Sequence, residues 1–199
     1  MKHLGDIRNI NGYAIEIPDI VCGGSPCQDL SVAGKRAGFE GERSGLFYEY
    51  IRVVKELRES SARNLRTTNT GLIKPRYMVL ENVPGLYSSS EGKDFQACLT
   101  EIIRIVQPNA PDVPKPDRGG WNKSGWLSGV GASGCPFSVA WRMHDAQFWR
   151  VPQRRKRISV LVDFNGLTAP KILFDSELRG ASDEGGTLLL ERDPGRESR

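Results

Sequence analysis

The chain has 199 residues, 38% of them hydrophobic, and a formal net charge of +4. This length fits one α/β domain, alone or with the start of another, and the mild positive charge permits a nucleic-acid partner. No apolar run reaches the length of a signal-peptide core or a membrane span, so we expect a cytoplasmic protein that does not enter membranes. The four cysteines contain no C-x-x-C pair, which argues against structural zinc and against a disulfide framework.

The first predicted strand is the apolar run Asp19–Cys22, which ends at a pair of glycines. Cys22 lies inside this run and is expected to be a small buried side chain. Cys27 follows in a Gly/Ser-rich turn beside Pro26, where free backbone N–H groups can stabilise a thiolate. Its local context leaves a reactive and a structural role about equally open. In an open α/β sheet, however, reacting groups collect at the carboxyl ends of strands.

A glycine-rich segment, Val32–Ser44, separates this turn from the next element. Its spaced glycines disfavour a helix and indicate a loop, either a solvated one or one that meets phosphate through its cations. Apolar residues at helical spacing then predict a helix over Gly45–Glu59, with Ser44 as its N-cap. The polar segment Ser60–Lys74 is predicted to be a connector.

The second predicted strand, Tyr77–Leu80, leads directly into Glu81. If the two strands are parallel, Glu81 and Cys27 emerge at the same edge of the sheet and can serve one pocket. The alternative is a loop carboxylate that faces water. A second amphipathic helix is predicted over Asp94–Val106.

The segment Pro108–Pro136 is rich in proline and glycine and is predicted to be irregular. Its Trp121 and Trp126 either pack the loop onto the body or form a stacking platform for bases. Alternation over Phe137–Arg142 predicts a half-exposed strand, and Ile158–Phe164 predicts another strand. Four consecutive cations at 154–157 precede that last strand and can contact phosphate, or can form a generic basic surface.

Three short motifs in this order resemble the DNA (cytosine-5)-methyltransferase family. They are Pro26-Cys27-Gln28, Glu81-Asn82-Val83 and Gln153-x-Arg155-x-Arg157. Three further runs are also similar to family motifs: Gly5-Asp6-Ile7, Arg43-Ser44-Gly45-Leu46-Phe47 and Asp145-Ala146-Gln147-Phe148-Trp149-Arg150-Val151-Pro152. The resemblance covers about residues 5–164 and implies an α/β, Rossmann-like fold of S-adenosylmethionine-dependent methyltransferases.

This resemblance implies a catalytic set of Cys27, Glu81 and Arg155. Cys27 would add to C6 of a cytosine and make C5 nucleophilic. Glu81, kept protonated by burial or sharing a proton with the base, would bind the N3/N4 edge. Arg155 would contact the flipped cytosine, whose extrusion from the duplex costs about a few kcal/mol.

The methyl donor implied by the resemblance is S-adenosyl-L-methionine. The expected donor-binding residues are Asp6, Ile7, Pro26 and Leu46, and the residues expected to contact DNA or order the pocket are Gln28, Ser31, Arg43, Asn82, Gln153 and Arg157. The expected partner is double-stranded DNA with a flipped cytosine, bound by a monomer without a metal ion. A role in restriction–modification is also implied.

Two departures from the family pattern shape our expectation. The family's Phe-x-Gly-x-Gly motif and the acidic residue of its second motif are absent, and the sequence stops soon after Phe164, where target recognition would begin. We therefore expect a partial catalytic domain over 1–164, followed by the start of a target-recognition region or a disordered tail over 165–199. The main alternative is a catalytically inactive DNA-binding remnant. A cysteine hydrolase is a weaker alternative, because no motif places a histidine near Cys27.

Overall fold

The computed structural model describes residues 3–25, 45–68, 72–116, 120–149, 152–174 and 187–189. The strands are β1 (Ile20–Gly24), β2 (Tyr77–Asn82), β3 (Ser124–Val130), β4 (Pro136–Asp145), β5 (Lys156–Asp163) and β6 (Thr187–Leu189). The helices are α1 (Gly45–Thr68), α2 (Lys93–Arg104) and α3 (Ala169–Phe174). Four short 3-10 helices, η1 (Ile7–Asn9), η4 (Pro84–Tyr87), η5 (Ser89–Gly92) and η6 (Ala146–Trp149), complete the elements used below.

The six strands form one mixed sheet in the order β1-β2-β5-β4-β3-β6. Strands β1 and β2 are parallel and joined through α1, which is the β-α-β unit expected of a Rossmann-like fold. Strands β2, β5, β4 and β3 are successively antiparallel, and β6 runs parallel to β3. The predicted α/β class is confirmed.

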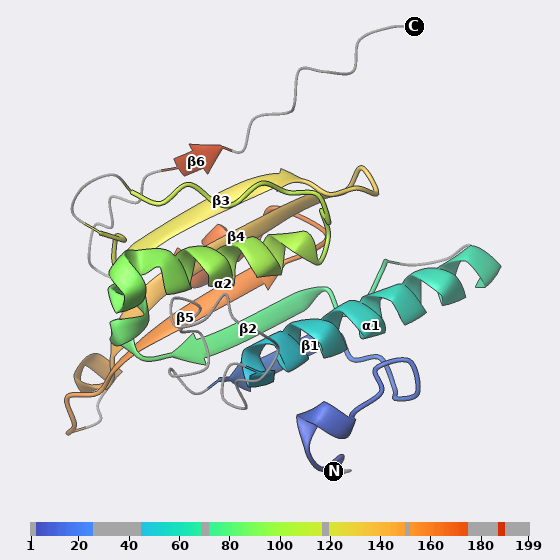
Figure 1. Cartoon of the computed structure of the whole chain (residues 1–199), viewed down its shortest axis with the longest axis horizontal. Coiled ribbons are helices and arrows are strands. Elements are labelled where there is room, and N and C mark those ends of the chain that lie inside the picture. Colours follow the sequence, from blue (N-terminus) through green and yellow to red (C-terminus); the bar gives the residue numbers. More distant parts are fainter. Residues whose placement is uncertain are drawn as a thin grey trace, which may run out of the picture.

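Helices α1 and α2 lie on one face of the sheet, α1 along β1 and β2 and α2 over β5 and β4 (Figure 1). The main apolar core lies between them and this face, where Met78 and Leu80 of β2 pack beside Val160 and Val162 of β5. The short helix α3 belongs to a smaller apolar cluster, in which Ala169 packs with residues of β4 and β5 that point to the other face. The sheet is thus the middle layer of the fold.

Helix α1 continues nine residues beyond the predicted end at Glu59, so the first part of the predicted connector Ser60–Lys74 is helical. Two buried polar residues, one on either side of Glu59, anchor this part of the helix to the chain before β2. Arg58 donates to the carbonyl of Pro75 at 2.6 Å, and the Ser61 hydroxyl accepts from the Lys74 N–H at 2.8 Å. Burial lowers the pKa of Arg58 to about 10.

The prediction that Pro108–Pro136 lacks regular structure was wrong, because this segment contains β3. Two glycines that suggested a broken chain make room for aromatic rings of β4. A Cβ at Gly125 would lie 2.4 Å from the Trp141 ring, and one at Gly129 would lie 2.9 Å from the Phe137 ring. Trp121, 7% exposed, packs against Phe95 with ring centroids 5.0 Å apart, so it serves packing.

Two burial predictions were also wrong. Strand β1 is an edge strand with an exposed Cys22, not a buried strand. Strand β4 is buried on both faces over most of its length, not half exposed. Its Ser138, which points away from the main core, is covered by the turn before α3: it donates to the Gly166 carbonyl at 3.0 Å and accepts from the Ala169 N–H at 3.2 Å.

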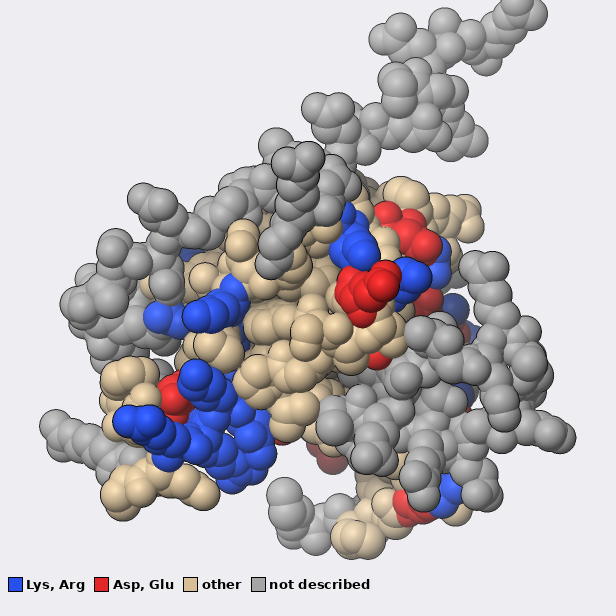
Figure 2. Space-filling model, turned by 60° about the vertical axis from the view of Figure 1, so that its left-hand side comes forward, with Lys and Arg blue, Asp and Glu red and all other residues tan. Residues whose placement is uncertain are grey.

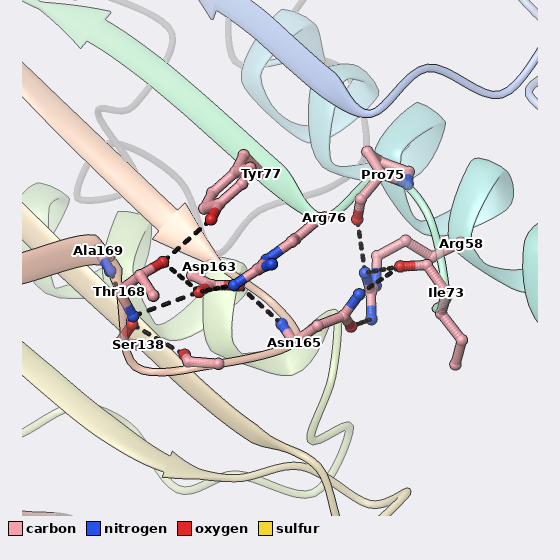
Figure 3. A network of polar contacts seen from close by, with 11 residues as sticks. Arg58, Ile73, Pro75, Arg76, Tyr77, Ser138, Asp163, Asn165, Thr168 and Ala169 are labelled. Atoms are coloured by element: carbon pink, nitrogen blue, oxygen red, sulfur yellow. Dashed lines mark hydrogen bonds and ion pairs between the residues drawn. The ribbon is translucent and has the colours of Figure 1, made fainter. Parts of the chain in front are cut away.

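At its carboxyl end, β5 carries a fully buried carboxylate, Asp163 (Figure 3). Arg76 donates to it through Nε and Nη2, each at 3.1 Å, and Thr168 and Asn165 add further hydrogen bonds. Burial acts to raise the pKa of Asp163, but these hydrogen bonds outweigh it and the pKa lies below its ordinary value. This network joins the turn after β5 to the start of β2.

Candidate active site

Several residues that the sequence singled out lie at the other end of the strands, where β1 and β2 end and β5 begins. Parallel pairing places Gly24, at the end of β1, directly beside Glu81 of β2. Because β5 is antiparallel to β2, its first residues lie at this same edge. The parallel pairing that the prediction required is observed, and the meeting of Glu81 with Cys27 stays a prediction. Cys27 itself lies outside the described residues, as do Pro26, Gln28, Ser31 and Arg43.

Glu81 forms an ion pair with Arg157 across β2 and β5. The Arg157 Nε lies 2.6 Å from Glu81 Oε1, and the two side chains are 31% and 48% exposed. The expected burial of Glu81 is therefore wrong for this structure. The other carboxylate oxygen lies over β1, where a Cβ on Gly24 would come within 3.2 Å of Oε2. The absence of a side chain at Gly24 thus leaves room for the Glu81 carboxylate.

Asn82 fixes the chain that continues from β1 towards Cys27. This side chain is 3% exposed, and its Nδ2 donates to the Ser25 carbonyl at 3.1 Å and to the Ser25 hydroxyl at 3.3 Å. Its Oδ1 accepts from the Val83 N–H at 2.8 Å. A buried amide with both ends satisfied holds a defined geometry. The pocket-ordering role predicted for Asn82 stays a prediction, but its contacts have the form that role requires.

Tyr50 of α1 is a site residue that sequence reasoning assigned only to the apolar face of a helix. Its hydroxyl lies 3.0 Å from the carbonyls of Val21 in β1 and Val79 in β2. Its ring occupies the space beside Gly23, where a Cβ would come within 3.0 Å. Burial raises the pKa of this phenol above its ordinary value. The available signal was one hydroxyl-bearing side chain on an otherwise fully apolar helix face, together with the Gly-Gly pair at the strand end.

A pocket of about 580 Å³ opens beside the end of β1. Its lining includes Ile7 and Leu46, two of the predicted donor-binding residues, together with Tyr50, Glu16 and the strand end at 23–25. This volume is within the usual range for small-molecule sites, and an apolar lining with few polar groups is their usual composition.

Asp6, another predicted donor-binding residue, is not among the residues that line this pocket. Its carboxylate caps η1 by accepting from the Arg8 N–H at 2.9 Å, and it pairs with the Arg8 guanidinium at 2.7 Å. The side-chain and backbone hydrogen bonds from Arg8 lower the pKa of Asp6 to about 2. Its predicted role therefore remains a prediction.

Gln153 and Arg155 lie on the exposed chain before β5, beside Arg154 and Lys156, which are also exposed. Figure 2 turns this side of the molecule forward and shows Lys and Arg gathered on it with few acidic groups between them. The cation in contact with Glu81 is Arg157, for which the sequence suggested an ordering role, while Arg155 is fixed through its backbone to Asp145. The arrangement can bind an anion beside the carboxylate.

Within the described residues no group of three or more His, Cys, Asp or Glu side chains is arranged to hold a metal ion. Among the same residues, no helix combines the length and apolar character needed to cross a bilayer.

In this mixed α/β sheet, Glu81 of β2 lies beside the end of β1, the strand that precedes Pro26 and Cys27 in the sequence. Residues 1–106 match the family model described as C-5 cytosine-specific DNA methylase. The match spans more than half of the 199 residues, and the chain belongs to this family.

Curated relatives cover most of this chain. A protein of Escherichia phage P1 named DNA N-6-adenine-methyltransferase is 30% identical over an alignment 194 residues long, which covers 89% of this chain and 24% of that protein. The orphan methyltransferase M.Rho11sI of Bacillus phage rho11s is 39% identical over 159 residues, or 80% of this chain and 22% of that protein. The type II methyltransferase M.AquIA of Picosynechococcus sp. is 39% identical over 150 residues, or 75% and 45%.

The chain thus spans less than half the length of each of these three relatives. Among solved structures, the crystal structure of the S. pombe Dnmt2 methyltransferase is similar with a TM-score of 0.45 and 16% identity, over 92% of this chain and 42% of that chain.

Proposed function

We propose that this chain carries the catalytic part of a DNA methyltransferase that methylates C5 of cytosine through a covalent adduct of Cys27. The observation that carries the proposal is the Glu81 carboxylate, held beside the end of β1 by Arg157 at 2.6 Å. Cys27 is two residues beyond Ser25, and two residues of chain reach at most about 7 Å. Because Asn82 fixes Ser25, this short reach supports the proposal that the Cys27 thiol works beside this carboxylate.

The chemistry needs a nucleophile because C5 of cytosine does not take a methyl group unaided. In the proposed reaction the Cys27 thiolate adds to C6, and the electron pair of the C5–C6 double bond makes C5 nucleophilic. S-Adenosyl-L-methionine supplies the methyl group, which C5 takes while S-adenosyl-L-homocysteine leaves. A base then removes the C5 proton, the C5–C6 double bond re-forms, and Cys27 is released as a thiolate.

Glu81 is proposed to hydrogen-bond the N3/N4 edge of the cytosine and to stabilise the charge that develops on the ring. Its exposed fraction of 48% leaves it open to a base in this structure. Arg157 orients the carboxylate from the side opposite Gly24, and Arg155 is proposed to contact the flipped base. A cytosine bound against Glu81 would exclude water from its carboxylate and supply the burial that the proposed role requires.

The pocket at the end of β1 fits the adenosyl part of the methyl donor. Ile7 and Leu46 offer apolar contacts to a purine ring, and the Glu16 carboxylate in the lining can accept hydrogen bonds from ribose hydroxyls. The predicted donor role of Pro26 is kept, because Pro26 directly follows Ser25 of the lining.

Double-stranded DNA is the proposed substrate. The exposed cations Arg154 and Lys156 would contact phosphates beside the site and offset part of the cost of base flipping. Gln28, Ser31, Arg43 and Gln153 are proposed to contact the DNA or to order the pocket, as the resemblance implies.

The experiment is methyl transfer by this chain from labelled S-adenosyl-L-methionine to duplex DNA, followed by nucleoside analysis. We expect label in 5-methylcytosine. Label in N6-methyladenine, the product suggested by the name of the phage P1 relative, would contradict the choice of base. DNA binding without any transfer would contradict activity and support the alternative of an inactive DNA-binding remnant.

A further inference from the structure

Asp145 is a buried carboxylate at the point where β4 leaves the sheet, on the edge that carries Glu81 and Arg157. Its exposed fraction is 8%, and the strand register pairs it with Lys156 at the start of β5. No role at this site has been assigned to it so far. A carboxylate at such a depth is costly to bury unless hydrogen bonds compensate for its lost hydration.

The donors to Asp145 are amides from the two chain segments that meet here. The Arg155 N–H donates to Oδ1 at 3.2 Å, and the Gln147 N–H donates to the same oxygen at 3.3 Å. The Gln147 side-chain amide donates to Oδ2 at 3.0 Å. The Ala146 N–H also donates to the Arg155 carbonyl at 3.0 Å. Both backbone polar groups of Arg155 are therefore bound to the end of β4.

We infer that Asp145 is a positioning residue. It holds the backbone of Arg155 in place, so that the exposed guanidinium extends towards the substrate from a fixed backbone position. The inference rests on the proposed function. The last residue pair of β4 and β5 is Asp145 with Lys156. Because the Asp145 carboxylate also binds the N–H of Arg155, the residue before β5, it extends the ordered pairing by one residue to Arg155. A group that contacts substrate performs best when its supporting residues are themselves fixed.

A purely structural role for Asp145 is the competing explanation, and Asp163 provides the matched control. It is also a buried carboxylate on a sheet strand that binds neighbouring amides and a hydroxyl, but it stands at the far end of β5. Asp163→Asn should destabilise the fold without moving Arg155. Asp145→Asn keeps an oxygen that can accept from Arg155 and should lose less than Asp145→Ala.

The test combines methyl-transfer rates with amide hydrogen exchange, measured on the whole chain below its unfolding temperature. We expect Asp145→Ala to lower the transfer rate about 100-fold and Asp145→Asn to restore part of it. In an Arg155→Ala background, Asp145→Ala should add little, because the group that it positions is gone. Asp163→Asn should leave the rate near that of the unchanged chain.

Exchange at the Arg155 amide should accelerate in Asp145→Ala and not in Asp163→Asn. An additive double mutant, or unchanged exchange at Arg155, would overturn the inference. Absence of transfer by the unchanged chain would overturn the proposed function and, with it, the effect of Asp145 on rate. The exchange measurement would still decide whether Asp145 holds Arg155.

Discussion

Arg157 on β5 contacts Glu81 on β2, with Nε and Oε1 2.6 Å apart, beside the glycine pair that ends β1. Both side chains are about one-third to one-half exposed. The pair is therefore accessible to a substrate. It contributes little to the free energy of unfolding, but it orients the Glu81 carboxylate.

Replacing Arg157 should separate these two effects. Arg157→Ala should change the free energy of unfolding by less than about 1 kcal/mol, because exposed ion pairs contribute little. It should nevertheless slow methyl transfer strongly, because Glu81 loses the group that orients it. Urea denaturation and transfer rates measure the two effects, with Arg63→Ala, which removes an exposed cation on α1, as the control. If the loss of transfer rate, expressed as a free energy, were no larger than the loss in the free energy of unfolding, an orienting role would be contradicted.

Asn82 should be needed for the position of the chain that leads to Cys27. Asn82→Ala removes the donors to Ser25 and leaves its partly buried carbonyl without this bond, at a cost of about 1 kcal/mol. Asn82→Asp keeps the acceptor for the Val83 N–H but cannot donate to Ser25 when ionised. Both variants should therefore slow the reaction of the Cys27 thiol with a cytosine substrate. An Asp variant with the original rate would show that the bond to Ser25 is dispensable.

Asp163 should make stability depend on acid pH. Its pKa is lowered in the folded chain below the unfolded value of about 3.8, so its stabilising effect is complete above that pH and is lost as the pH falls through the folded pKa. At neutral pH, Asp163→Asn should lower the free energy of unfolding by about 2 kcal/mol. This is less than the roughly 3 to 5 kcal/mol expected for a fully buried pair, because Arg76 is one-third exposed.

Thermal unfolding of both forms from pH 2 to 7 measures this effect. The difference between them should shrink below about pH 3.8. A constant difference across the range would contradict an ionised Asp163 paired with Arg76.

Lys156 should contribute to DNA affinity through phosphate alone. Lys156→Gln removes one exposed cation at the start of β5, and the slope of log affinity against log salt should fall by about 1, equally for different DNA sequences. Fluorescence anisotropy at several salt concentrations measures the slope. A sequence-dependent loss of affinity would instead indicate a base contact.

The sequence located the strands around the candidate site better than it predicted the exposure of their residues. Hydrophobic runs located β2 and β5 because their side chains fill the core, and strand order placed Glu81 at the end of β1. The alternation of β4 misled, because α3 and the turn before it, far along the chain, cover the face that would otherwise be exposed. Likewise, the glycines of β3 suggested a loop, since nothing local reveals that aromatic rings of β4 occupy their empty side.

The cation that contacts Glu81 could not be chosen from sequence. Arg155 and Arg157 belong to the same sequence motif, which does not say which of them contacts Glu81. The register of β5 against β2 decides that the Arg157 side chain reaches the carboxylate. The role of Tyr50 was missed for a related reason, because its hydroxyl meets carbonyls of two strands that lie 29 residues before and after it in the sequence.

The most direct test of the proposed mechanism is the covalent adduct between this chain and duplex DNA that carries 5-fluorocytosine, in the presence of S-adenosyl-L-methionine. Fluorine at C5 replaces the proton that must leave, so the sulfur–C6 bond persists and intact mass measures it. We predict an adduct that maps to Cys27, is lost in Cys27→Ser, and is retained in Cys22→Ser, which removes the exposed thiol of β1. An adduct that survives Cys27→Ser, or one lost equally in Cys22→Ser, would contradict the assignment of Cys27 as the nucleophile.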